Sequence, residues 1–467
     1  MTLFSERFYL RPLTKTDVSP RYVEWLNDDM ARRFILSASE KPTVESVREY
    51  VDLKQNDPSV IFWGIFLRST GQHIGNIKYE PIDFSAGTAV MGILIGEPDW
   101  RGRGVAAEVL NETIQFLVSR YRISTVVLGV DRQNVGAIRA YKKAGFFEEA
   151  TDILSPSNDS ISMVRTVSPD SFRGASFCLG TAQFGSPYGI ANKAGKVPTK
   201  DAEIIIKYCD NNGIDTLDTA SLYGNAESIL GEVGVQNWKV ITKLQALPDG
   251  LNDVSGWVEK QVTESLARLK VPKLYGLLLH RPNNLFSQRS EELIHALSRV
   301  KESGLVSFLG VSVYSPEEID DLLSVFPAEL IQLPYNVLDQ RFRHDGTIQK
   351  LNNSRIEVHA RSLFLQGLLL MDSNDRPKYF QTWYRQLHDW DEYVKNSSLP
   401  SVAVCTRFVW QDQNVQKSVI GVQHVDQLQA IINTVPAIES VSDSLLRLRC
   451  EDQDLINPNK WNIESRV

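Results

Sequence analysis

Four ionisable side chains fall at or just after the ends of short apolar segments, which is where a barrel enzyme keeps its catalytic groups. An apolar strand ends at Leu217, Asp218 lies at its tip, and Tyr223 follows in the loop. The next apolar segment ends at Lys243, and the one after it ends at His280. Such groups donate and accept protons, so the chemistry they favour is acid–base catalysis. In a (β/α)₈ barrel the carboxyl ends of the strands converge on one mouth, so we expect the four side chains to meet there.

These four residues resemble the catalytic set of the aldo-keto reductase superfamily. The resemblance implies that Tyr223 donates a proton to a substrate carbonyl and that Lys243 lowers the pKa of that phenol. It also implies that Asp218 pairs with Lys243, that His280 orients the carbonyl, and that NADPH or NADH supplies the hydride. A structural interpretation stays open, with Asp218 as a helix cap, Lys243 as a solvated strand end and His280 as a core residue.

The elements that must position these residues are eight short strands at the spacing of strand–helix units. The intervening segments, such as Ala202–Asn211 and Trp257–Leu269, have helical patterns, so about 295 residues fit a (β/α)₈ (TIM) barrel. An insertion at Met371–Pro400 carries Trp383, Tyr384, Trp390 and Tyr393, which either cap a substrate or form a helix core. The predicted strands are Phe177–Gly180, Ile214–Asp218, Val240–Lys243, Leu274–His280, Leu305–Val311, Leu330–Leu333, Ile356–Arg361 and Ser418–Val422.

The resemblance also implies which barrel residues hold the nicotinamide end of the dinucleotide. Gly180 and Thr181 would lie beneath the ring, and Ser312 beside it. Gln332 would bind the carboxamide, and Tyr335 would stack on the ring.

The remaining dinucleotide contacts follow from later motifs, with two departures from the family pattern. Val313 stands where the family usually has an asparagine, and an asparagine that holds the adenine is replaced near Ile431. No arginine suited to a 2′-phosphate occurs at Val422–His424. The expectation of NADPH over NADH therefore comes from the family resemblance alone. The implied contacts are Arg361, Ser362, Leu363, Gln366 and Gly367 around the pyrophosphate, and Gly421 and Gln427 at the adenosine end.

A second candidate site lies in the first third of the chain, where the strand Val90–Ile95 runs into a turn rich in glycine and arginine. Gly102 and Gly104 let backbone N–H groups approach an anion, and the helix that follows favours negative charge at its N-terminus. The alternative is a turn that needs glycine for its geometry alone.

This turn and a later segment resemble the GNAT acetyltransferase superfamily. The run Arg101, Gly102, Arg103, Gly104, Val105 and Ala106 matches its pyrophosphate-binding motif. The resemblance implies acetyl-CoA as cosubstrate, with Asn134 on the pantetheine arm, Tyr141 as the acid for the departing thiolate, and N–H groups at Leu94 and Ile95 for the thioester oxygen. Tyr141 is alternatively a core residue of its helix.

The first part of the chain reads as a mixed sheet with helices, an α+β fold. Glu80 and Glu97 are either the general base or exposed carboxylates. The segment Trp25–Asp28 resembles the branch that acetylates ribosomal proteins and nucleotide-linked amino sugars. Strands are expected at Phe8–Leu13, Ile61–Leu67, Gln72–Glu80, Val90–Ile95, Thr125–Val130 and Ser160–Val167, and helices at Asp17–Phe34 and Thr43–Asn56.

Composition sets the class of protein. With 467 residues, 42% apolar and 23% charged, the chain suits two globular domains, and its net charge of −7 argues against a general nucleic-acid binder. No apolar run approaches the roughly 20 residues that span a bilayer, and Met1–Leu10 lacks the features of a secretory signal. Four cysteines lie far apart without metal-ligand spacing, which fits a reduced cytoplasm and predicts no metal site.

The predicted organisation is an acetyltransferase domain at residues 1–167, a linker at 168–174 and a reductase barrel at 175–467. The pairing predicts a bifunctional enzyme for small molecules that acts on amino or keto sugars, free or linked to nucleotides, in surface glycan synthesis, and it leaves a homodimer open. The alternative is an acetyltransferase for protein N-termini or small amines fused to a nicotinamide-binding regulatory barrel.

Overall fold

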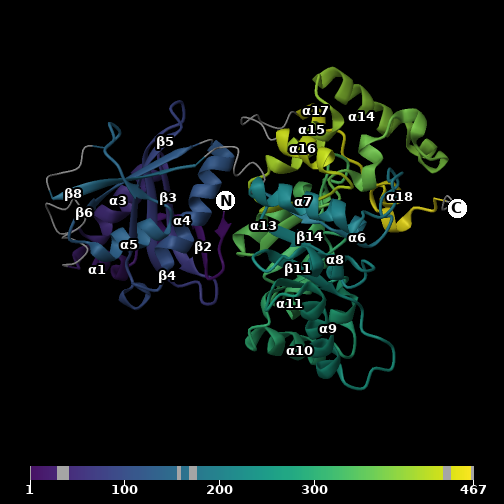
Figure 1. Ribbon diagram of the computed structural model, residues 1–467, viewed down its shortest axis with the longest axis horizontal. Coiled ribbons are helices and arrows are strands. Elements are labelled where there is room, and N and C mark those ends of the chain that lie inside the picture. Colours follow the sequence, from purple (N-terminus) through teal and green to yellow (C-terminus); the bar gives the residue numbers. More distant parts are fainter. Residues whose placement is uncertain are drawn as a thin grey trace. The chain divides into compact units, whose positions relative to one another are not determined.

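The chain folds into two compact units, residues 1–172 and 173–467, in a computed structural model (Figure 1). The structure describes residues 2–28, 42–121, 123–154, 159–167, 176–434 and 443–463. The predicted linker, residues 168–174, lies outside the described residues. Within these ranges no helix combines the length and the apolar character needed to cross a bilayer.

The first unit is built on one sheet of eight strands in the order β1-β2-β3-β4-β5-β6-β8-β7. Neighbouring strands are antiparallel except β5 and β6, which pair in parallel, so the sheet is mixed as predicted. The strands are β1 (Leu3–Phe4), β2 (Phe8–Pro12), β3 (Ile61–Leu67), β4 (His73–Asp83), β5 (Thr88–Ile95), β6 (Thr125–Asp131), β7 (Phe147–Glu148) and β8 (Ser160–Thr166).

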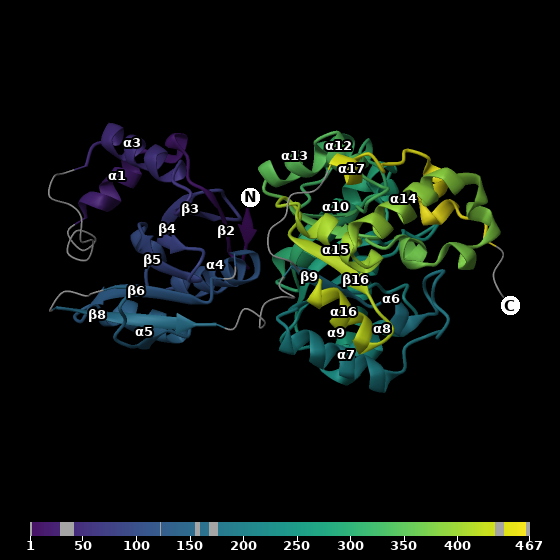
Figure 2. The ribbon, with the colours of Figure 1, turned by 90° about the horizontal axis from the view of Figure 1, so that it is seen from above.

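Helices cover both faces of this sheet because successive side chains of a strand point to opposite faces. Phe62 of β3 packs in one apolar cluster with α1 (Pro20–Asn27) and α3 (Val44–Gln55). Trp63 packs in another with α4 (Val105–Tyr121) and α5 (Val135–Lys143). Figure 2 shows α1 and α3 together on one side of the unit and α5 on the other.

Helix α1 begins three residues later than the predicted start at Asp17. The carboxylate of Asp17 is bound by Arg11 and by the Thr14 backbone, which keeps it in a separate 3₁₀ turn. Ser19 is the N-cap instead, and Pro20 opens the helix, a position that needs no N–H donor. The helix ends at Asn27, with Asp28 as a C-cap in an extended conformation, well before the predicted end at residue 34, which itself lies outside the described residues.

The second unit is a closed barrel of eight parallel strands, with helices on its outside (Figures 1 and 2). This confirms the predicted (β/α)₈ architecture. The strands, in barrel order, are β10 (Thr216–Asp218), β11 (Lys239–Leu244), β12 (Leu274–Leu279), β13 (Val306–Ser312), β14 (Leu330–Pro334), β15 (Glu357–Arg361), β16 (Lys417–Gly421) and β9 (Phe177–Gly180). The helices are α6 (Ala182–Gly185), α7 (Thr199–Asn211), α8 (Ala226–Val233), α9 (Val254–Leu269), α10 (Ser290–Glu302), α11 (Glu318–Val325), α12 (Arg341–His344), α13 (Thr347–Asn353), α14 (Tyr384–Ser397), α15 (Ser401–Trp410), α16 (Val425–Asn433), α17 (Asp443–Leu446) and α18 (Gln453–Ile456).

The insertion before β16 forms α14, and its aromatic residues belong to the packing of the unit. Trp390 is fully buried and donates its indole N–H to the carbonyl of Leu369. Trp383 and Tyr393 pack against the same core, whereas Tyr384 is exposed. None of the four lines the barrel cavity described below. The interpretation as core residues therefore holds for Trp383, Trp390 and Tyr393 but not for the exposed Tyr384.

Candidate functional sites

The four ionisable residues singled out in the sequence line one cavity of about 490 Å³ in the barrel unit. Asp218 is the last residue of β10, Lys243 is the penultimate residue of β11, and His280 directly follows β12. Because these strands are parallel and adjacent, their ends bring the side chains together at one rim. Tyr223 reaches the same cavity from the loop after β10.

Asp218 and Lys243 form a buried ion pair with 2.6 Å between Oδ2 and Nζ. Only 5% of the Asp218 side chain and 1% of the Lys243 side chain are exposed. The other carboxylate oxygen accepts a 2.7 Å bond from Gln332, and Nζ also donates to the carbonyl of Thr219. Burial is the largest effect and lowers the pKa of Lys243, but the Asp218 carboxylate, Tyr223 and Cys178 together raise it by more. The net pKa lies above its ordinary value, and the ammonium keeps its charge.

Tyr223 stands beside this pair, with Lys243 Nζ 5.1 Å from the centroid of its ring. Burial raises the pKa of the phenol by more than the Lys243 ammonium lowers it. The net direction is therefore opposite to the acidic phenol expected from the sequence, because the cost of burying a phenolate outweighs one nearby cation. The loop is fixed by Gly185, where an added Cβ would lie 1.6 Å from the carbonyl oxygen of Tyr223.

His280 faces Tyr223 edge-on, with 6.1 Å between the ring centroids. Burial and the nearby Lys243 ammonium lower the pKa of the imidazole to about 4, so the ring is neutral near pH 7. Its Nδ1 is buried and has no hydrogen-bond partner among the described residues.

Most of the residues assigned to the dinucleotide lie together in the lining of this cavity. Gln332 faces the cavity and donates one of its side-chain N–H groups to Asp218. Val313 is buried away from the lining, so no side-chain amide follows Ser312. The predicted residues that line the cavity are Gly180, Thr181, Ser312, Gln332, Arg361, Ser362, Leu363, Gln366, Gly367, Gly421 and Gln427.

Tyr335 is the exception, and the prediction that it stacks on the nicotinamide ring is wrong. The side chain is fully buried outside the cavity lining, and its hydroxyl contacts Asp412 and Arg343 at 3.2 Å. Side chains alternate across a strand, so an inward Gln332 places the residue three positions on at the opposite face. Tyr314, which follows β13 and does line the cavity, is the aromatic residue that the sequence reading missed.

The loop after β15 carries backbone strain where it lines the cavity. Ser362, Leu365 and Gln366 have φ values of 62°, 47° and 53°, in the left-handed region that non-glycine residues rarely adopt. Clusters of such residues are typical of ligand-binding loops. Neither this strain nor the contribution of Asn457, Pro458 and Asn459 to the lining was predicted, because no local motif marks them.

The first unit has a second candidate site where β5 and β6 diverge. The two strands pair only from Thr88 to Val90, so their later parts separate, and β5 continues to Ile95 paired with β4 but no longer with β6. Leu94 and Ile95, predicted to hold a thioester oxygen, lie on this unpaired stretch. A splayed parallel pair leaves room between the strands for an extended ligand arm.

The turn after β5 has the form expected for an anion site. Gly102 and Gly104 have φ values of 75° and 78°, and a Cβ on Gly102 would meet no atom within 4 Å. The chain then enters α4 at Val105, followed by the half-buried Ala106, and the first turns of a helix offer unpaired N–H groups. Arg103 is exposed, with its guanidinium 5.8 Å from the Trp100 ring centroid. The open turn therefore fits a pyrophosphate.

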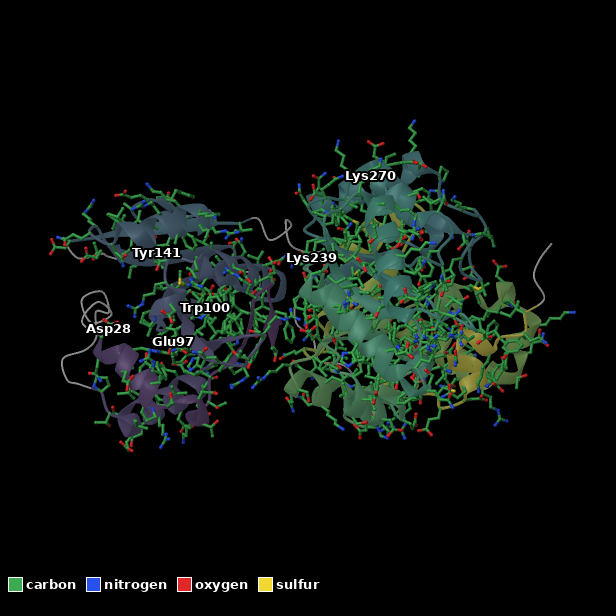
Figure 3. All side chains as sticks on the ribbon, turned by 90° about the horizontal axis from the view of Figure 1, so that it is seen from below. Asp28, Glu97, Trp100, Tyr141, Lys239 and Lys270 are labelled. Atoms are coloured by element: carbon green, nitrogen blue, oxygen red, sulfur yellow. The ribbon has the colours of Figure 1, made fainter. Side chains whose placement is uncertain are left out.

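Arg101 differs from the others because its side chain is already occupied. Its guanidinium donates to the carbonyls of Ile95 and Gly96 and pairs with Asp28 at 2.9 Å. Any contact with a pyrophosphate would therefore come from its backbone, while the side chain fixes the end of β5 (Asp28 is labelled in Figure 3).

Asn134 and Tyr141 both lie on α5, with Asn134 as the N-cap whose side-chain oxygen accepts from the Ala137 N–H. Tyr141 is half-buried and packs against the sheet cluster, with Phe146 6.1 Å away between ring centroids (Figure 3). Burial raises the pKa of its phenol to about 12, so the group holds a proton at pH 7. That state suits an acid and does not exclude a packing role.

Neither carboxylate considered as a general base is free. Glu97 is buried and accepts from Arg21 and the indole of Trp25, and the Arg21 guanidinium lowers the pKa of Glu97 (Figure 3). Glu80 is paired with Lys54 and Lys78. Glu97 is thus neither an exposed carboxylate nor a group poised to take a proton.

Comparison with known protein families gives two matches. The aldo/keto reductase family model matches residues 176–447, and the GNAT acetyltransferase domain model matches residues 7–147. GNAT domains use acetyl-CoA and aldo-keto reductases use NAD(P)H, so acetyl-CoA is the cosubstrate of the first unit and NAD(P)H that of the barrel.

Individual relatives resemble one unit each. The "Uncharacterized oxidoreductase YcsN" of Bacillus subtilis (strain 168) is 26% identical over 204 residues, which is 39% of this chain and 67% of that protein. The "Probable N-acetyltransferase YjcK" of the same organism is 27% identical over 154 residues, 32% of this chain and 84% of that protein. The "6-dehydroglucose reductase" of Novosphingobium aromaticivorans is 33% identical over 140 residues, 27% of this chain and 45% of that protein. The chain therefore belongs to the aldo/keto reductase family through its barrel and joins to it a GNAT acetyltransferase domain.

Proposed function

We propose that the barrel reduces a substrate carbonyl, with Tyr223 as the proton donor. The observation that carries this proposal is the convergence of Tyr223, Lys243, Asp218 and His280 on one cavity. Bound NAD(P)H supplies a hydride to the carbonyl carbon. The Tyr223 hydroxyl gives its proton to the carbonyl oxygen, and the Lys243 ammonium stabilises the phenolate left behind. The neutral His280 ring donates one N–H to the same oxygen, which orients the carbonyl.

Asp218 acts through Lys243 in this proposal. A buried ammonium without a counter-charge would lose its proton, and the 2.6 Å ion pair prevents that. The predicted dinucleotide residues that line the cavity would hold the cofactor along it. The strained loop Ser362–Gly367 fits a phosphate-binding segment.

For the first unit we propose acetyl transfer from acetyl-CoA to an amine. The open turn at Gly102 and Gly104 would bind the pyrophosphate, and N–H groups near Leu94 and Ile95 would bind the thioester oxygen as the amine attacks. Tyr141 would protonate the departing thiolate, since its raised pKa keeps the proton in place. Glu80 and Glu97 are assigned no role as base because both are held by cations.

The substrates we propose are amino and keto sugars, free or linked to a nucleotide, on the way to a surface glycan. One sugar offers both groups that the two units act on, an amine and a carbonyl or hydroxyl. The relative named 6-dehydroglucose reductase supports a sugar carbonyl for the barrel. A reduced cytoplasm suits the four free thiols of the chain.

The test is turnover by the full chain on a panel of keto-sugar and amino-sugar nucleotides, with NADH or NADPH oxidation followed by absorbance and thiol release by a disulfide reagent. We expect Tyr223→Phe to lower reductase turnover by at least about 100-fold while acetyl transfer stays unchanged. Reduction by the Phe variant at the wild-type rate would remove Tyr223 from its role. Acetylation of peptides alone, with no sugar used, would refute the sugar assignment.

A further inference from the structure

One cation in the barrel cavity has no anionic partner among the residues that the structure describes. Arg361, the last residue of β15, is half-buried in the cavity lining. Its terminal nitrogens donate to the carbonyl of Val313 at 3.0 Å and to the Ser362 hydroxyl at 3.3 Å. Its Nε is buried and has no hydrogen-bond partner. Across the described ranges, the contacts of this guanidinium thus include no carboxylate, although arginine is the side chain best suited to bind one.

The position of Arg361 is at the reacting end of the cavity. Its guanidinium lies 4.4 Å from the centroid of the Tyr314 ring. A second guanidinium, that of the exposed Arg281, lies 5.6 Å from the same ring and directly follows His280 in the chain. After burial and Lys243, these two cations are further causes that lower the pKa of His280, as expected for positive charges close to the imidazole.

The carboxylates near this pair are engaged elsewhere. Asp218 is neutralised by Lys243, and Asp339 is bound at 2.8 Å through both of its oxygens by Arg341. Glu318 accepts from the backbone N–H groups of Tyr314 and Ser315. Among the described residues, the hydrogen bonds of the Arg361 guanidinium therefore go to a carbonyl and a hydroxyl and not to a carboxylate, next to the groups that would handle a substrate carbonyl.

We propose that the carbonyl substrate carries an anionic group, a carboxylate or a phosphate, which Arg361 binds with help from Arg281. This inference rests on the proposed reductase function and narrows its substrate class. It also gives Arg361 a role different from the pyrophosphate contact expected from the sequence. Each terminal nitrogen of Arg361 makes one bond within the protein and carries a second N–H, so the guanidinium can still donate charge-assisted hydrogen bonds to such a group. Sugar acids, sugar phosphates and nucleotide-linked sugars all meet this requirement, whereas an uncharged sugar does not.

The experiment compares matched aldehydes that differ in charge. The first pair is D-glyceraldehyde 3-phosphate and D-glyceraldehyde, and the second is 4-carboxybenzaldehyde and its methyl ester. We expect the wild-type chain to favour the charged member of at least one pair by about tenfold or more in kcat/KM, as one or two charge-assisted hydrogen bonds allow. The pair that shows this preference distinguishes a phosphate from a carboxylate.

Variants then assign the preference to its residues. Arg361→Gln should reduce the charged-to-neutral ratio of kcat/KM about tenfold, and Arg281→Gln by a smaller factor of about three because that side chain is solvated. The matched control is Arg299→Gln, which removes an exposed cation on α10 and should leave the ratio unchanged. Dissociation constants of NADH and NADPH, measured by fluorescence, report on the dinucleotide separately.

The outcomes separate this inference from the function it rests on. Turnover of neutral aldehydes with no preference for charged ones would overturn the inference and leave the reductase assignment intact. The same holds if Arg361→Gln weakens dinucleotide binding at least tenfold while the ratio stays constant, since Arg361 would then serve the dinucleotide. Absence of NAD(P)H oxidation with every aldehyde would refute the reductase assignment itself.

Discussion

The ion pair between Asp218 and Lys243 gives the sharpest test of how the barrel site is held together. In Asp218→Asn the side-chain volume is kept and only the negative charge is removed. The Lys243 ammonium then has no counter-charge while its side chain stays 1% exposed. Breaking a buried pair by removing one partner typically costs about 3–5 kcal/mol.

An independent limit follows from the lysine itself. Neutralising a lysine of ordinary pKa 10.5 at pH 7 costs about 5 kcal/mol, at about 1.4 kcal/mol per pKa unit. The loss cannot exceed this value, because the variant can always release the proton. For a barrel of roughly 300 residues, a loss of about 3–5 kcal/mol lowers the melting temperature by about 5–8 °C.

The dependence on pH provides the signature of this mechanism. In the wild-type protein the pKa of Lys243 is raised, so its contribution to stability is complete below pH 10.5 and is lost only as pH rises through the raised folded value. In Asp218→Asn burial acts alone and lowers the pKa of Lys243 in the folded state. The unfolded chain then binds more protons than the folded one, so the stability of the variant rises between pH 7 and pH 9.5, by about 2–3 kcal/mol.

The measurement is calorimetric melting of the full chain at pH 7 and pH 9.5, with urea unfolding followed by tryptophan fluorescence. Glu264→Gln is the control, since this carboxylate is 43% exposed and its ion pairs should be worth less than about 1 kcal/mol. A variant at Asp218 that melts within about 1 °C of wild type at both pH values would refute the reasoning.

Three further predictions follow from particular contacts. Because the pKa of His280 is lowered to about 4 from 6.5, the folded ring resists protonation, so the stability of the wild-type protein falls as pH drops from 6.5 toward 4. Urea unfolding at pH 7 and pH 5 should show a loss of up to about 2 kcal/mol in the wild-type protein that His280→Asn does not show. Equal pH profiles for the two proteins would contradict this. Gly185→Ala should displace the Tyr223 loop, because its Cβ would lie 1.6 Å from the Tyr223 carbonyl oxygen. We expect this displacement to lower reductase turnover at least about tenfold in steady-state assays. Turnover at the wild-type rate would show that the loop tolerates the shift. Tyr335→Phe should cost only about 0.5–1.5 kcal/mol in urea unfolding and leave NAD(P)H affinity within about twofold, since its hydroxyl bonds lie outside the cavity; a tenfold loss of affinity would show that this hydroxyl serves the dinucleotide site.

Much of the barrel could be predicted because its strands are buried on both faces and read as short apolar runs. The predicted strand Phe177–Gly180 has the observed bounds of β9, and the other seven agree within two residues at each end. The position of the ionisable residues followed from the same pattern, since a charged side chain at the end of such a run can only lie at a rim. The start of helix α1 was predicted too early, at Asp17, because a carboxylate that can cap a helix can equally bind an arginine, as Asp17 does here with Arg11.

What the sequence could not supply depends on three-dimensional surroundings. The direction of the Tyr223 pKa depends on how deeply the phenol is buried, which no local pattern encodes. Tyr335 was predicted to face the dinucleotide because its motif matched that of the family. The alternation of side chains along the strand, with Gln332 facing inward, argued for the opposite face. Tyr314 lies near the cavity only because β13 ends there, and the two guanidiniums beside its ring come from β15 and from the residue after His280.

Arg101 links two parts of the first unit that a reaction with two substrates would need to coordinate. Its guanidinium joins the carbonyls at the end of β5 to the carboxylate of Asp28, the C-cap of α1. A molecule that orders the turn after β5 would therefore also order the end of α1, and the reverse holds by thermodynamic reciprocity. We expect a ligand bound at the turn after β5 to increase the affinity for any ligand that contacts the end of α1, and the second ligand to increase the affinity for the first by the same factor.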